Sequence, residues 1–156
     1  MYDFLKPIID IIRATPMASF IILLLYCTRS GTVPLFMATL VVIPLVWGNV
    51  IEGIRAVDNK ILDMAKLYEV DTMTKLKKIY LPYIKPYLRS AVIIGSGFAF
   101  KSCVAAEVIS STGFSIGQKI YESKVYLETE RLFAWTVVII ILSIAFEKLI
   151  VKVMGR

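Results

Sequence analysis

Apolar residues gather in four long segments, which short polar turns and one long polar loop separate. The segments cover about residues 7–27, 34–51, 88–109 and 132–151. A transmembrane helix needs about 20 apolar residues, or about 17 at the short end. The pattern therefore predicts an all-α, polytopic membrane protein with about four transmembrane helices, in one domain that covers residues 1–156.

The first two segments contain residues that interrupt a straight helix. Asp10, Arg13 and Pro16 lie in the first segment, and Pro44 lies in the second. Proline removes a backbone hydrogen bond, and its ring disturbs the preceding turn. We expect the first helix to break near residues 15–16, where irregular backbone at membrane depth must face protein or a water-filled path.

The loop between the second and third segments, about residues 55–86, predicts two short amphipathic helices. Its apolar residues recur at helical spacing: Ile61, Ala65 and Tyr68, then Met73, Leu76 and Tyr80. Asp58 and Asp71 stand where N-caps are expected. Pro82 is expected to end the second helix, with Leu81 before it in an extended conformation. The loop is thus predicted to be a helix–turn–helix.

The distribution of charge indicates which ends of the spans lie in the cytoplasm. Hydrophobic residues make up 58% of the chain, which excludes an ordinary soluble domain. The net charge is +6, and basic residues concentrate in the loop and at the C-terminus: Lys60, Lys66, Lys75, Lys77, Lys78, Lys85, Arg89, Lys148, Lys152 and Arg156. By the positive-inside rule, both places are predicted to be cytoplasmic, with residues 28–33 and 110–131 outside. No basic run is interleaved with aromatic residues, which argues against nucleic-acid binding.

Residues suited to catalysis or metal binding are scarce. The chain has no histidine, and its two cysteines, Cys27 and Cys103, lie in apolar segments. We therefore predict no metal site, no cofactor and no catalytic residue. Residues 95–102 resemble a phosphate-binding loop, but Phe100 replaces its second glycine and no strand precedes it. Small residues in this stretch predict close helix packing instead: Ser96, Gly97, Ala99 and Ser102.

Three charged residues inside apolar segments are candidates for a translocation path: Lys101, Glu107 and Arg13. A charge at the bilayer centre costs about 2.5–3.5 kcal/mol on insertion scales, so such groups usually face an interior or a pathway. Lys101 and Glu107 are six residues apart, which puts them on different faces of a helix. Lys101 could face the path or a neighbouring helix, or extend to the membrane surface, and Glu107 could reach the headgroups.

The spacing within the loop resembles the cytoplasmic loop of permease subunits in binding-protein-dependent ABC importers. That family has Glu-Ala-Ala, three residues, Gly, nine residues and Ile-x-Leu-Pro. This chain has Asp63-Met64-Ala65, Glu69 and Ile79-Tyr80-Leu81-Pro82 at the same spacing. The resemblance implies that the loop docks into a groove on a separate ATPase subunit, so that this chain is not itself an enzyme. The coupling residues it implies are Asp63, Ala65, Lys66, Tyr68, Glu69, Ile79, Leu81 and Pro82.

Glu69 is the departure from the family pattern with the largest physical consequence. Glycine at the end of a helix usually adopts the left-handed conformation, and a non-glycine residue there costs about 1 kcal/mol or more. The turn is therefore either strained or built differently. Asp63 and Met64 also depart from the pattern, and a plain surface connector between two spans is the alternative interpretation of the loop.

Motifs outside the loop resemble the nitrate/sulfonate/taurine branch of these permeases. They are Leu5, Pro7, Arg13 and Pro16, then residues 104–109, 113–117 and 132–135. That branch has six spans, with the loop between the fourth and fifth. We therefore expect the first two spans to be missing here, through a natural short form, a misplaced start codon or a fragment.

The resemblance implies a function and a set of partners. It implies the permease subunit of an ATP-driven importer in the inner (plasma) membrane, for a sulfonate-, nitrate- or taurine-like anion or a small heterocycle. The expected partners are an ATP-binding subunit, a second permease copy in a homodimer, an external solute-binding protein and the lipid bilayer. The alternative is a truncated or non-transporting small integral membrane protein.

Overall fold

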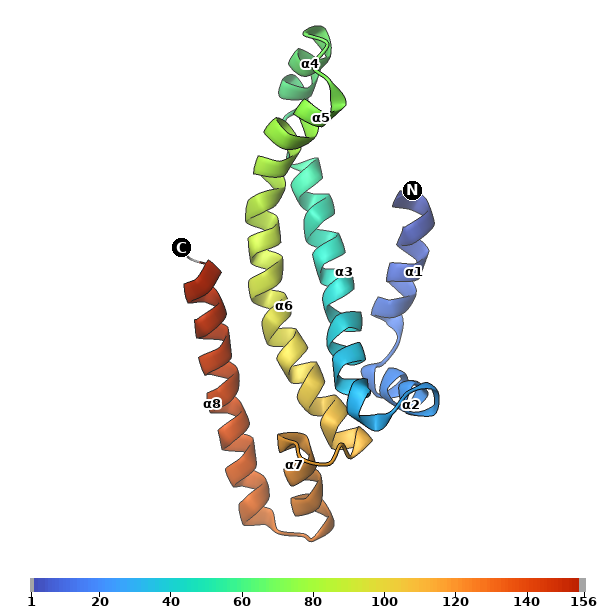
Figure 1. Cartoon of the computed structure of the whole chain (residues 1–156), viewed down its shortest axis with the longest axis vertical. Helices are drawn as coiled ribbons and strands as arrows, with labels where there is room; N and C mark the ends of the chain where they lie inside the picture. Colours follow the sequence, from blue (N-terminus) through green and yellow to red (C-terminus); the bar gives the residue numbers. More distant parts are fainter. Residues whose placement is uncertain (1, 155–156) are drawn as a thin grey trace.

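Two long helices, α3 (Val33–Arg55) and α6 (Leu81–Ser110), lie side by side and antiparallel along the length of the molecule (Figure 1). The computed structural model describes residues 2–154, and Arg156 of the basic C-terminus lies outside them. All regular structure in this described part is helical, which confirms the predicted all-α class.

The shorter helices lie at the two ends of this pair (Figure 1). At one end, α4 (Asn59–Leu67) and α5 (Thr72–Lys75) project beyond α3 and α6. At the other, α2 (Met17–Cys27) and α7 (Ile116–Val125) lie beside the long helices. We call these the loop end and the opposite end.

Small residues allow α3 and α6 to pack closely. A Cβ atom at Gly53 would lie 3.0 Å from Ile84 Cα, so α3 meets the backbone of α6 near the loop end. Gly95 of α6 faces Val42 and Leu45 of α3. The buried residues of α6 are all small: Ala91, Gly95, Gly97, Ser102, Ala106 and Ser110. Between helices in lipid, close van der Waals contact replaces the hydrophobic effect as the main attraction.

The first apolar segment is a broken helix, as predicted. α1 (Tyr2–Ala14) and α2 meet at a bend of 101°. Pro16, just before α2, has φ −60° and ψ 135°, because a proline without an N–H cannot continue α1. α2 therefore turns across the opposite end, where Ile21 is buried in a cluster with Met37 of α3 and Ala106 of α6.

The number of spans is settled in part. In the described residues, two helices are long and apolar enough to cross a membrane, Ser30–Arg55 and Thr72–Ser110, and the bent α1–α2 pair makes a third if it is one span. The first of these begins with the short helix η1 (Ser30–Thr32). The fourth expected span corresponds to α8 (Thr129–Met154), which lies beside α6 and α7. That α8 crosses the membrane remains a prediction.

Pro82 does not end the second loop helix, so that prediction is wrong. The helix continues from Thr72 to Ser110, and Leu81 is helical, with φ −59° and ψ −44°. A wider π-helical turn, η2 (Leu76–Tyr80), precedes Pro82, and in it the Leu81 N–H donates to the Leu76 carbonyl five residues back. Such a widened turn displaces the carbonyl that the proline ring would otherwise meet, so the helix passes through Pro82.

α7 lies against α6 through a close contact at a glycine. The Gly117 N–H donates to Glu107 Oε2 at 3.0 Å, and the Ser115 hydroxyl caps α7 by accepting the Gln118 N–H at 3.1 Å. A Cβ atom at Gly117 would overlap Glu107 Cβ and lie 2.8 Å from the Val108 backbone nitrogen. Since the obstacle includes backbone, no larger residue fits without moving α7.

Replacing Gly117 by alanine should therefore lower the thermal stability of the protein. Overpacking typically costs about 1–3 kcal/mol, which should appear as a lower midpoint of thermal unfolding in detergent. Gly113→Ala is the matched control, because nothing lies within 4 Å of the Cβ position there. Equal midpoints for the two variants would contradict the close contact between α6 and α7.

Candidate functional site

Both loop helices begin at an aspartate cap, as predicted. Asp58 Oδ1 accepts the Lys60 N–H at 2.9 Å at the start of α4, and Asp71 Oδ2 accepts the Thr74 N–H at 3.0 Å at the start of α5. Hydrogen bonds from the side chain and backbone of Thr74 lower the pKa of Asp71 from its ordinary 3.8. Because the pKa of Asp71 is depressed in the folded state, the ionised cap stabilises the loop at neutral pH. This stabilisation is lost as the pH falls through the lowered pKa of Asp71.

Glu69 adopts the left-handed backbone conformation that usually belongs to glycine, with φ 50°. The Glu69 N–H donates to the Lys66 carbonyl and the Val70 N–H to the Ala65 carbonyl, both at 3.0 Å. This is the Schellman pattern that ends many helices. The turn thus keeps the backbone geometry of the family's glycine although Glu69 occupies the position. The sequence allowed either a strained turn or a turn of different construction, and the structure shows the strained one.

The surface at the tip of the loop is apolar. Leu67 and Tyr68 are 80% and 74% exposed, and Met64 is exposed beside them. We call Met64, Leu67 and Tyr68 the tip face. Ala65 is only 3% exposed, so any partner at the tip would meet its larger neighbours first. The sequence motif points to Ala65 and Tyr68, and the structure adds Met64 and Leu67 as exposed apolar residues. Their spacing of three residues already put these two on one face of a helix.

The remaining motif residues divide between the tip and the base of the loop. Lys66 Nζ lies 3.5 Å from Asp63 Oδ1 beside the tip face, and both side chains are largely exposed. An exposed pair of this kind stabilises a helix little, so both charges remain available to a partner. Ile79 is half-buried in η2, and Leu81 and Pro82 are exposed where α6 begins.

Lys101 lies beside a charged residue of a neighbouring helix. Its Nζ is 3.7 Å from Glu147 Oε1 of α8 and 6.0 Å from the centre of the Phe98 ring. Both charged side chains remain partly exposed. Glu147 is not among the residues predicted from the sequence. Its position as an acidic residue inside the last apolar segment could have indicated a partner for Lys101.

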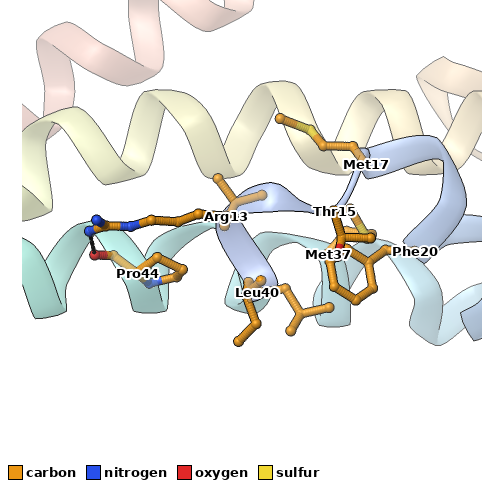
Figure 2. Close-up of a pocket in the computed structure, with 9 residues that line it drawn as sticks. Arg13, Thr15, Met17, Phe20, Met37, Leu40 and Pro44 are labelled. Carbon is orange, nitrogen blue, oxygen red and sulfur yellow. Dashed lines mark hydrogen bonds between the residues drawn. The ribbon is translucent and has the colours of Figure 1, made fainter. Parts of the chain in front are cut away.

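Glu107 and Arg13 occupy two other places, so the structure does not bring the three candidate charges together. Glu107 holds the first turn of α7 through Gly117. Arg13 lies in the last turn of α1, and its Nη2 donates to the Pro44 carbonyl of α3 at 2.7 Å (Figure 2). Arg13 also lines two neighbouring cavities, of about 200 and 170 Å³.

Comparison with known proteins identifies the family. Residues 1–154 match the model of the binding-protein-dependent transport system inner membrane component. The chain belongs to this family. The resemblance to ABC importer permeases found in the sequence is thereby confirmed, and the family together with the apolar helices places this permease in a membrane.

Two relatives of the permease illustrate the match. It is 27% identical over 93 residues to the putative aliphatic sulfonates transport permease protein SsuC of Bacillus subtilis, a match that covers 60% of this chain and 33% of that protein. It is 25% identical over 99 residues to a probable ABC transporter permease protein of Brucella melitensis, a match that covers 64% of this chain and 40% of that protein. The chain thus matches a third to two fifths of these relatives' lengths, and the first agrees with the sulfonate-type branch predicted from the flanking motifs.

Replacing Glu69 by glycine should stabilise the permease by roughly 1 kcal/mol, because glycine reaches this φ without a clash of Cβ. The measurement is the midpoint of thermal unfolding in detergent, which should rise. Glu69→Ala removes the same charge but keeps Cβ, so it should give no such gain. Equal gains from both variants would assign the effect to the charge and contradict the strain.

Proposed function

We propose that the chain is the membrane-spanning permease part of an ATP-driven importer and that its loop binds a separate ATPase subunit. The observation that carries this proposal is the tip face, an exposed apolar surface at the end of a hairpin that projects beyond the long helices (Figure 1). Family membership supports the same function, because the family model describes the membrane component of a binding-protein-dependent transport system.

The tip face has the chemistry of a helix that binds in a groove. Fully burying a leucine-sized side chain contributes about 1.5–3 kcal/mol, so three exposed apolar side chains on one short helix favour a partner that covers them. An amphipathic helix presents such residues at spacings of three and four to an apolar groove, as Met64, Leu67 and Tyr68 do here. Asp63 and Lys66 beside them would set orientation and partner choice more than affinity.

The continuous helix from Thr72 to Ser110 supports a mechanical role for the loop. α5, η2 and α6 form one unbroken element, so a displacement at the loop would move α6 without a hinge at Pro82. The contact of Gly53 with Ile84 joins α3 to the same element near the loop end. ATP-driven closure of the ATPase subunits would thus shift the two long helices together, between inward-open and outward-open states.

The positive-inside rule favours a cytoplasmic loop end. The loop carries the largest cluster of basic residues, and Lys148 and Lys152 follow the apolar part of α8. The start of α1 and the end of α8 both point toward the loop end (Figure 1). In this orientation the permease crosses the membrane several times, and α2 and α7 face the external solute-binding protein.

The family and its sulfonate-type relative suggest the rest of the assembly. We expect two permease copies, two ATPase subunits and an external binding protein, with a small anion as the solute and a small heterocycle as the alternative. The name of the Bacillus subtilis relative refers to aliphatic sulfonates, which makes ethanesulfonate a suitable first probe. A small membrane protein that does not transport is the competing interpretation.

Leu67→Asp should separate the permease from its ATPase subunit. A carboxylate buried without a partner in an apolar groove should weaken association about tenfold or more. The measurement is co-purification of the co-expressed ATPase subunit, together with ATP-driven uptake of labelled ethanesulfonate by proteoliposomes. Leu127→Asp is the matched control, because Leu127 is similarly exposed, at 86%, but lies beyond α7 at the opposite end.

Co-purification should survive Leu127→Asp and fail with Leu67→Asp. If Leu67→Asp keeps both the ATPase subunit and uptake, the loop is only a connector. If the unmodified chain retains no ATPase subunit, the non-transporting interpretation replaces this one.

A further inference from the structure

We propose that Arg13 binds the anionic group of the transported solute, in the cavity beside the α1–α2 bend. The inference deepens the proposed function, on which it rests, by naming a binding residue and a solute class: a small oxyanion, sulfonate or carboxylate, with a short apolar chain. It stands on the cavity, on the position of the guanidinium and on the observation that no described carboxylate forms an ion pair with it.

The cavity lies where the first segment leaves its helical path. It has a volume of about 200 Å³ and is lined by the end of α1, the start of α2 and the middle of α3 (Figure 2). Arg13 donates to the Pro44 carbonyl, and Pro44 lies near the middle of the candidate span Ser30–Arg55. The guanidinium is therefore expected about halfway across the bilayer core. Irregular backbone at such a depth is tolerated where it lines a cavity.

The lining of the cavity fits an amphipathic anion. Most of the lining side chains are apolar: Ile12, Met17, Phe20, Met37, Leu40 and Val41. The polar members are Arg13 and Thr15, and the Thr15 hydroxyl already donates to the Ile11 carbonyl. Arg13 therefore supplies the available positive charge, and the apolar wall suits an alkyl chain. Met17, the first residue of α2, also brings the positive end of that helix dipole to the cavity.

The Arg13 guanidinium is held in place with donors to spare. A guanidinium has five N–H donors, and among the described residues Arg13 makes one hydrogen bond, from Nη2 to the Pro44 carbonyl at 2.7 Å. None of the described carboxylates forms an ion pair with it, although Asp10 and Glu52 line the adjoining cavity. A cation in this state recognises a planar or tetrahedral oxyanion through paired N–H groups.

Gly48 makes room for this arrangement. A Cβ atom there would lie 2.9 Å from Arg13 Nη2, so any larger residue must displace the guanidinium. Gly48 and Arg13 both line the second cavity, of about 170 Å³, which continues toward the loop end between α1 and α3. Arg13 thus lies between the two cavities and lines both of them.

Binding can be measured on the assembled complex without relying on transport. In a Cys27→Ser, Cys103→Ser background, Leu40→Cys places a thiol on the cavity wall, and its rate of labelling by a neutral maleimide is followed with added ethanesulfonate, propionate or ethyl methyl sulfone. We expect ethanesulfonate or propionate to slow labelling several-fold and the neutral sulfone to have no effect. Protection by one anion alone identifies the headgroup.

Three variants test the role of Arg13 in this assay. Arg13→Met should weaken anion protection and uptake about tenfold, the usual value of a hydrogen-bonded charge. Arg13→Lys should retain part of both, and Gly48→Ala should weaken both with the charge still present. Arg89→Met removes an arginine from α6, away from this cavity, and should change neither. Basal ATP hydrolysis should be equal in all variants, which shows that they fold and assemble.

The outcomes separate this inference from the proposed function. If Arg13→Met keeps full anion protection of the thiol and full uptake of ethanesulfonate, with ATP hydrolysis unchanged, the Arg13 site is wrong. The proposed importer function is then unaffected. If neither anion protects the Leu40→Cys thiol while Arg13 is present, the Arg13 site is also wrong. Protection without any ATP-driven uptake contradicts the importer and supports the anion site.

Discussion

The structure depends on the close packing of α3 against α6. In lipid, neighbouring helices gain little from the hydrophobic effect, so their attraction comes from van der Waals contact over small residues. Gly53 meets the backbone at Ile84, and Gly95 of α6 faces Val42 and Leu45 of α3. This contact fixes where the chain can place everything else, with the loop at one end and α2 and α7 at the other.

The packing also explains how a small surface could control the long helices. The tip face lies at the C-terminal end of α4, and the chain continues from there through the Glu69 turn into the helix that includes α6. The left-handed Glu69 directs the chain sharply from one loop helix to the next, at a cost in backbone strain of about 1 kcal/mol. Such strain persists where the surrounding structure determines the conformation, and here the two capped helices and the Schellman hydrogen bonds do so.

Much of the fold could be predicted from the sequence, because strong local rules decide it. Pro16 breaks the first segment, and Asp58 and Asp71 cap the loop helices. The rule for Pro82 failed because it considers only the residue before a proline, whereas the preceding π-helical turn changes where the carbonyls lie. No pattern in the sequence of residues 76–80 indicates that their hydrogen bonds are π-helical.

The candidate site was harder to predict, because its residues depend on contacts between distant segments. The spacing of Ile61, Ala65 and Tyr68 predicted an apolar face on the first loop helix. Only the folded loop shows that Ala65 is covered while Leu67 is exposed. Lys101 was recognised as a costly charge, yet its neighbour Glu147 is 46 residues away in the chain. Glu107 was considered for a path or for the headgroups, and only the position of Gly117 reveals its hydrogen bond to α7.

The central claim is that the loop turn lies against an ATPase subunit, and cross-linking tests it most directly. In the Cys27→Ser, Cys103→Ser background, Glu69→Cys should cross-link to the co-purified ATPase subunit through a short bifunctional thiol reagent. The yield should change when ATP is added. Phe114→Cys, exposed at the opposite end, should give no such product. A complex that imports solute normally but shows no cross-link from position 69, with or without ATP, would contradict the account.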